Sequence, residues 1–244
     1  MVIRILGFLF LTALPLMAAT YTGSLTYTPP GPATSSDGLA VGPSNLQWIT
    51  YTIGIFWTVT DTDNTYATHP WKYTYTFGHD GSQAGISHVI IETSPTFNAS
   101  SMVGLTGASF SALGLQFSNG GNPNMPEYIY GLKVDPLTSP EMSMTFSFYS
   151  DRAPVWGDFY ARCGGKLGGI NYAYNYNNTD GVENGFLNPD AITTNIDDID
   201  PLAAATNGSL NFHILRPDSV VPEPATLSLM SLAGVALLRR RKSA

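Results

Sequence analysis

The stretch WKYTYTF, residues 71–77, alternates aromatic side chains with lysine and threonine. Successive side chains of a β-strand point to opposite faces, so this alternation predicts a strand with one apolar face and one polar face. Residues 142–148, MSMTFSF, repeat the pattern with methionine and phenylalanine. Apolar strand faces need a second apolar surface to cover them. The two stretches therefore favour an all-β domain built from packed sheets.

The rest of residues 20–215 has the same character. In residues 49–59, alternate positions carry isoleucine, tyrosine, tryptophan or valine, and Gly54 within this run predicts a β-bulge. Further strand candidates lie at residues 24–28, 88–92, 110–117, 128–134, 156–161, 170–176 and 209–215. Clusters of glycine, proline, asparagine, aspartate and serine separate them, as expected of turns. We predict a two-sheet antiparallel sandwich of jelly-roll-like form, with a closed barrel as the alternative.

The amino-terminal segment has the pattern of an export signal. Arg4 precedes an apolar run over residues 5–14, and Ala18 and Ala19 follow shortly after. A basic start, a short apolar core and small residues near the end are typical of a secretory signal peptide. We therefore assign residues 1–19 to a signal peptide; an uncleaved anchor is the alternative.

Charge excludes one class of partner. Residues 20–221 contain six lysines and arginines against 17 acids, a net charge of −11. Because phosphate binding needs a basic surface, this balance argues against nucleic acid. It is compatible with solubility outside the cell.

The carboxyl-terminal segment has three parts in a fixed order. After a predicted linker at residues 216–221 comes Pro222-Glu223-Pro224, and then an apolar run over residues 225–238. A helix of 14 residues spans about 21 Å, against about 30 Å for a hydrocarbon core, so we expect a short transmembrane helix. The chain then continues with a basic cluster, Arg239, Arg240, Arg241 and Lys242. Such a cluster stays on the cytoplasmic side of a membrane.

These three parts, residues 222–244, closely resemble the PEP-CTERM sorting signal of exosortase substrates. The resemblance implies that an exosortase recognises Pro222, Glu223 and Pro224 at the inner membrane and removes or exchanges the tail. It also implies delivery to the cell surface or the extracellular matrix of a Gram-negative-type bacterium, with an association with exopolysaccharide and biofilm. A plain tail anchor is the alternative reading of the same residues.

One strand candidate has the chemistry of a sugar-binding surface. Tyr172, Tyr174 and Tyr176 would share one face, where their rings could stack on sugars. Asn171, Asn175 and Asn177 fall on the other face, and their amides could bond hydroxyls. The alternative is that these tyrosines belong to the core.

Signals for metal or catalysis are weak. Asp61, Asp63 and Asn64 form an oxygen-rich candidate for calcium, although such residues also serve turns. A glycosidase would need two carboxylates about 5–10 Å apart, and any pair of the acids on or beside the predicted strands could converge: Glu92, Glu127, Glu141, Asp151 and Asp158. The single cysteine, Cys163, excludes an intramolecular disulfide, and we expect it to be a buried thiol.

The sequence thus favours an exported, non-enzymatic surface or matrix protein that needs no cofactor. A carbohydrate-binding module delivered by the same route is the second hypothesis. A surface polysaccharide hydrolase is the third.

Overall fold

The computed structural model describes residues 18–30, 38–42, 47–81, 84–126, 128–164, 169–175, 207–210 and 212–220. Thirteen strands and two short 3-10 helices, Gln47–Thr50 and Ala99–Ser101, lie within these ranges. The predicted transmembrane segment at 225–238 and most of the predicted signal peptide fall outside them. No helix in the described part of the chain is long and apolar enough to span a membrane.

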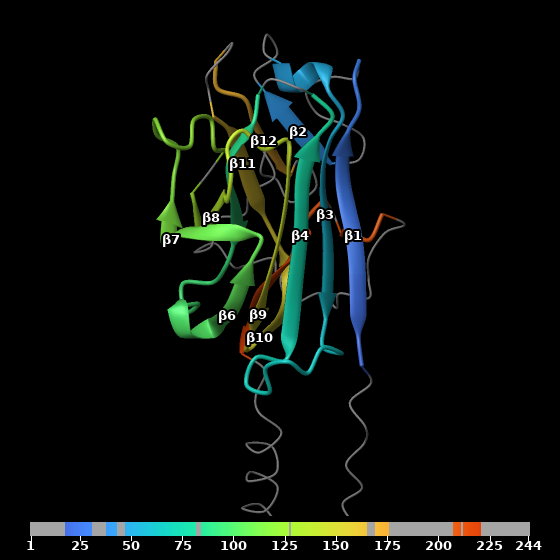
Figure 1. The fold of residues 1–244 in the computed structure, drawn as a ribbon, viewed down its shortest axis with the longest axis vertical. Coiled ribbons are helices and arrows are strands. Elements are labelled where there is room, and N and C mark those ends of the chain that lie inside the picture. Colours follow the sequence, from blue (N-terminus) through green and yellow to red (C-terminus); the bar gives the residue numbers. More distant parts are fainter. Residues whose placement is uncertain are drawn as a thin grey trace, which may run out of the picture.

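Five antiparallel strands form the first sheet (Figure 1). In spatial order they are β1 (Thr20–Tyr27), β3 (Ile53–Thr60), β4 (Trp71–His79), β9 (Ser143–Ser150) and β6 (Met102–Thr106). The two stretches with the clearest alternation, 71–77 and 142–148, became the neighbours β4 and β9. Their apolar faces coincide because Tyr75 pairs with Phe146 and Phe77 with Met144.

Six antiparallel strands form the second sheet. In spatial order they are β2 (Leu39–Gly42), β12 (Tyr172–Asn175), β11 (Phe159–Cys163), β5 (Ile86–Glu92), β8 (Ile129–Pro136) and β7 (Ala108–Gln116). A separate two-stranded ribbon joins β10 (Arg152–Gly157) to β13 (Ile214–Val220).

The core lies between the sheets and is rich in aromatic residues. Tyr73, Tyr75 and Phe77 of β4 are fully buried, and the rings of Phe77 and Phe159 approach to 6.2 Å across the two layers. The Tyr75 hydroxyl donates a hydrogen bond to the Leu215 carbonyl at 2.8 Å, which ties the five-stranded sheet to the ribbon. The predicted antiparallel sandwich is confirmed. Its sheets of five and six strands exceed the eight strands of a jelly roll.

Two local predictions were wrong. Gly54 is not at a bulge, because β3 pairs with β1 and β4 in unbroken register through this residue. Residues 49–51 precede the strand, since residues 47–50 form a 3-10 helix and β3 begins at Ile53. The helix buries Trp48, whose backbone N–H donates to the Asn171 side chain at 2.9 Å. That long-range bond explains why a local alternation did not extend the strand.

The predicted linker at residues 216–221 was also wrong. Residues 216–220 belong to β13, which pairs with β10 from Gly157↔Ile214 to Arg152↔Val220. Arg216 and Pro217 looked like the start of a polar connection, but Arg216 is buried. Pro217 lies at a register shift opposite Pro154, where a proline disturbs few ladder hydrogen bonds. The sandwich domain therefore extends to Val220.

Candidate functional site

The predicted tyrosine face lies on the outer surface of the six-stranded sheet. Tyr172 and Tyr174 are half-buried on β12, with parallel rings (7° between planes) whose centroids are 6.1 Å apart. They pack against a small apolar cluster outside the main core, consisting of Ile90, Met125, Ile129 and Tyr160. Tyr176 falls outside the described residues. Two of the three predicted rings are thus partly accessible on one surface.

Asn171 and Asn175 have a structural role, so the expectation that their amides meet a ligand was wrong, and Asn177 lies outside the described residues. Asn171 and Asn175 are fully buried. The Asn171 side chain accepts the Trp48 N–H and contacts the Cys163 thiol, while Asn175 accepts the Phe159 N–H at 3.0 Å. Strand alternation places them opposite the tyrosines, and this side faces the core.

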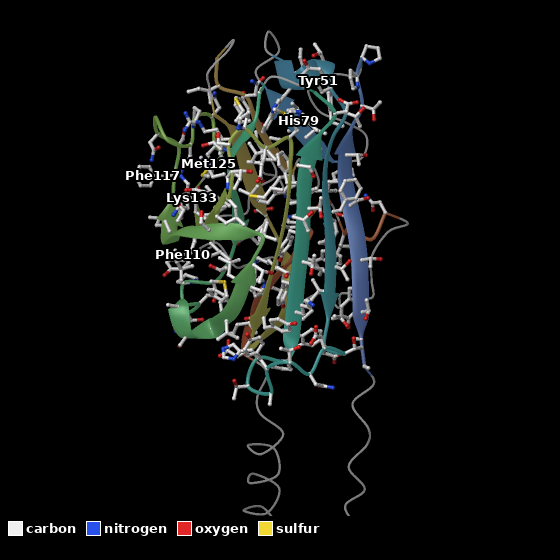
Figure 2. The ribbon with its side chains drawn as sticks, viewed as in Figure 1. Tyr51, His79, Phe110, Phe117, Met125 and Lys133 are labelled. Carbon is white, nitrogen blue, oxygen red and sulfur yellow. The ribbon has the colours of Figure 1, made fainter. Side chains whose placement is uncertain are left out.

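Two cations accompany the tyrosine pair. Arg162 lies directly opposite Tyr172 on β11, and Lys133 lies on β8 across the intervening β5. Arg162 Nη1 donates to the Gly121 carbonyl at 2.9 Å, and Lys133 Nζ donates to Asn122 Oδ1 at 3.4 Å. Figure 2 shows Lys133 and Met125 on this side of the domain. Within the described ranges, no carboxylate forms an ion pair with either cation.

A buried imidazole completes this surface. His88 lies opposite Arg162 on β5 and is 2% exposed. Burial, reinforced by the positive charges of Lys133 and Arg162, lowers the pKa of His88 to about 3. His88 is therefore neutral at physiological pH, and the positive charge of the surface comes from Lys133 and Arg162. We name the surface formed by Tyr172, Tyr174, Arg162 and Lys133 the tyrosine–cation face.

Sequence reasoning found the tyrosines of this face but missed its cations. The tyrosines are neighbours along one strand and share its period of two. Arg162 and Lys133 are 29 positions apart in sequence, and their proximity depends on the strand order β11-β5-β8. The single local signal was the position of Arg162 two residues after Tyr160, on the same strand face.

At the residues predicted to bind calcium, the ammonium group of Lys72 is paired with Asp63. Asp63 Oδ2 lies 2.9 Å from Lys72 Nζ and accepts the Tyr149 hydroxyl at 2.8 Å. Hydrogen bonds from Thr65, then those from Lys72 and Tyr149, hold the pKa of Asp63 well below its usual range. Asp61 accepts the Ala19 N–H at 2.6 Å. Since the lysine ammonium already neutralises Asp63, this geometry does not favour calcium. No cluster of three or more His, Cys, Asp or Glu side chains suited to a metal occurs among the described residues.

Of the five strand-associated acids, Glu92 and Asp158 come together, but inside the domain. They are 4% and 0% exposed, and the Asp158 N–H donates to Glu92 Oε2 at 2.7 Å. Asp158 Oδ1 accepts from Asn175 at 2.6 Å and lies 3.4 Å from His213 Nε2. Both carboxylates therefore stabilise the interior, and neither faces an open cleft. Cys163 is buried, as expected.

The sorting residues Pro222, Glu223 and Pro224 and the basic cluster 239–242 lie outside the described residues, so sequence comparison carries the argument there. No curated protein and no solved structure matches the chain. Residues 220–242 match the family model described as the PEP-CTERM protein-sorting motif. This match confirms the resemblance seen in the sequence and supports an exported protein that an exosortase sorts. The chain thus carries a carboxyl-terminal PEP-CTERM protein-sorting motif behind a β-sandwich domain.

Proposed function

We propose that this chain is a non-enzymatic protein that the exosortase route delivers to the cell surface or the extracellular matrix, where its sandwich domain is the working part. The observation that carries the proposal is the sorting motif at residues 220–242. The proposed partners are the exosortase, the inner membrane during transit, and exopolysaccharide at the destination. The internal positions of Glu92 and Asp158 support a role without catalysis.

The fold is compatible with cleavage of the chain between the sandwich domain and the sorting motif. The last strand, β13, ends at Val220, two residues before Pro222. Cleavage at or after the Pro-Glu-Pro sequence would leave every described strand in the product. The acidic balance of residues 20–221 suits a product that is soluble after release.

Intact mass and cell fractionation in the native host test this proposal. The wild-type protein is expected to lose its tail near residues 222–224 and to leave the inner membrane, whereas Glu223→Ala is expected to retain both tail and membrane location. Ser231→Ala, within the apolar run, serves as a matched control and should be processed normally. A full-length carboxyl terminus in wild type would overturn the proposal in favour of a plain tail anchor.

Carbohydrate binding is the second candidate function, and the tyrosine–cation face is the observation that favours it. Ring faces can stack on sugars, and cations that form no ion pair with a carboxylate in the described part of the chain can pair with acidic sugar groups. The corresponding ligand is an acidic polysaccharide. Affinity electrophoresis through gels containing polygalacturonate would show retardation that decreases in Arg162→Gln and Tyr174→Ala. Unretarded wild-type protein would remove this candidate.

A further inference from the structure

A groove of about 420 Å³ crosses the outer face of the five-stranded sheet, on the other sheet from the tyrosine–cation face. Its floor is a row of small residues in register on four adjacent strands, which pairs Thr26 with Gly54, Gly54 with Gly78, and Gly78 with Ser143. Phe56, 48% exposed, stands beside the row on β3. The groove therefore runs across the strands rather than along them.

The two glycines have different roles in the groove: Gly54 makes room for the Phe56 ring, and Gly78 leaves the floor open. A Cβ atom at position 54 would lie 2.7 Å from Cε2 of Phe56, so the ring occupies the room that a side chain would need. A Cβ atom at position 78 would lie 3.0 Å from Ser143 Oγ. Gly54 is buried beneath the Phe56 ring, whereas Gly78 is partly exposed, so a ligand can approach the sheet backbone closely at Gly78. The Phe56 ring stays exposed beside this floor.

The end of the groove is polar, and the described residues that line the groove include no lysine or arginine. His79 Nδ1 accepts the Gly81 N–H at 3.2 Å and Nε2 faces the Ala84 carbonyl at 2.9 Å, so the ring is the neutral Nε2–H tautomer. Burial lowers the pKa of His79, which keeps it neutral. Tyr51 stacks on His79, with centroids 6.0 Å apart (Figure 2). Asp80, exposed at the rim, accepts the Thr52 N–H at 2.9 Å through Oδ1.

We infer that this groove binds a ring of a neutral saccharide. An aromatic ring with hydroxyl groups around it matches the two surfaces of a sugar, which are a C–H face and a rim of hydroxyls. Phe56 provides the stacking surface, while Thr26, Thr76, Ser143 and Asp80 provide hydrogen-bonding groups. The Asp80 carboxylate and the lack of a lining cation disfavour an acidic sugar. The groove volume lies within the range of about 300–1,000 Å³ typical of small-ligand sites.

This site goes beyond the proposed route of export and does not depend on it. Binding by the groove is a property of the sandwich, whereas the mass and fractionation experiment concerns the tail. If the groove binds no saccharide, the proposed export route is unaffected. If the tail is not processed, the proposed binding by the groove is unaffected. The groove is also separate from the tyrosine–cation face, whose chemistry favours an acidic ligand.

Isothermal titration of the full chain in detergent tests the inference. The probes are cellohexaose, mannohexaose and xylohexaose, with hexagalacturonate as the acidic comparison. Wild type is expected to bind at least one neutral hexaose, and Phe56→Ala to weaken that binding about tenfold or more. Phe110→Ala is the matched control, because Phe110 is 52% exposed on the other sheet and lies away from His79 (Figure 2).

A second variant keeps the test sharp if Phe56→Ala perturbs folding. Thr76→Val preserves the shape of the side chain and removes its hydroxyl, so the expected loss is about threefold or more with unchanged thermal unfolding. The inference is overturned if wild type binds none of the neutral hexaoses. Equal losses in the Phe56 and Phe110 variants, or binding confined to hexagalacturonate, would overturn it as well.

Discussion

Arg216 Nε lies 3.4 Å from Glu92 Oε2, and both side chains are buried. Glu92 belongs to β5 in the six-stranded sheet and Arg216 to β13 in the ribbon, so this ion pair connects two separate parts of the β structure. The same Glu92 oxygen accepts the Asp158 N–H. A charge removed from water needs such partners, because each unpaired buried ion costs several kcal/mol.

Glu92→Ala should therefore lower the free energy of unfolding by about 3–5 kcal/mol, since it leaves the Arg216 guanidinium buried without its carboxylate. Urea denaturation measures this change. The double variant Glu92→Leu with Arg216→Met should lose less than the sum of the single losses. Lys72→Met, at the more exposed pair with Asp63, is the comparison and should have a much smaller effect. Strict additivity of the two buried changes would contradict this account.

His88 makes stability depend on pH. The pKa of His88 falls from 6.5 in the unfolded chain to about 3 in the folded chain. Between these two pH values, the unfolded chain binds a proton at His88 and the folded chain does not. The stability that neutral His88 contributes to the folded state is fully present above pH 6.5 and is lost as the pH falls from 6.5 towards 3. In that pH range, His88→Leu should reduce the slope of the unfolding free energy against pH by about 1.4 kcal/mol per pH unit. Parallel curves of unfolding free energy against pH for wild type and variant would contradict the prediction.

The tyrosine hydroxyls of β4 hold the ribbon against the five-stranded sheet. Tyr75 donates to the Leu215 carbonyl and Tyr73 to the Arg152 carbonyl, each at 2.8 Å and both buried. Tyr75→Phe should lower the unfolding free energy by about 1–3 kcal/mol, because the Leu215 carbonyl loses its side-chain donor in the interior. Tyr66→Phe, at a ring that is 39% exposed, is the control and should change little. Equal effects of the two substitutions would argue against this role.

Cys163 should be unreactive in the folded protein. Its side chain is 0% exposed, and Sγ lies 3.0 Å from the Asn171 backbone nitrogen. A thiol reagent such as DTNB should modify it in denaturant but not under native conditions. Rapid modification of the folded chain would show that the segment around β11 and β12 opens readily.

The basic cluster should control processing of the tail. Replacing Arg239, Arg240, Arg241 and Lys242 by glutamine removes the charges that favour a cytoplasmic terminus. The processed fraction in the native host should fall, as measured by intact mass. An unchanged processed fraction would show that the Pro-Glu-Pro sequence and the apolar run are sufficient.

Strands with strict alternation were predictable from sequence, and shorter or longer-range features were not. In β4 and β9 each face has one kind of side chain, so the pattern directly predicts the buried positions. In β2, all four residues are buried, so no alternation exists to be read. Residues 156–161 looked like one strand, but the chain leaves the ribbon and enters the six-stranded sheet at Asp158. The side-chain partner of Asp158 at this turn, Asn175, lies 17 residues away.

The two proposed ligand surfaces show the same limit. Tyr172 and Tyr174 could be placed on one face because they are two residues apart. The groove floor joins Thr26, Gly54, Gly78 and Ser143, whose alignment depends on the register of four strands. In sequence, Gly54 resembled a bulge because a glycine that makes room for a neighbouring ring and a glycine at a bulge look alike.

Because β13 ends next to the sorting motif, its position limits when the domain can fold on the proposed export route. This strand provides Ile214 and Leu215 to the core and Arg216 to Glu92. On the proposed export route, the sandwich therefore closes only after residue 220 has crossed the membrane. The Pro-Glu-Pro sequence begins two residues further along the chain, at Pro222. The predicted membrane segment begins at residue 225, and the four intervening residues reach at most about 14 Å. On the proposed route, folding and recognition by the exosortase therefore take place nearly together, and the closed domain stays against the membrane surface until its tail is removed.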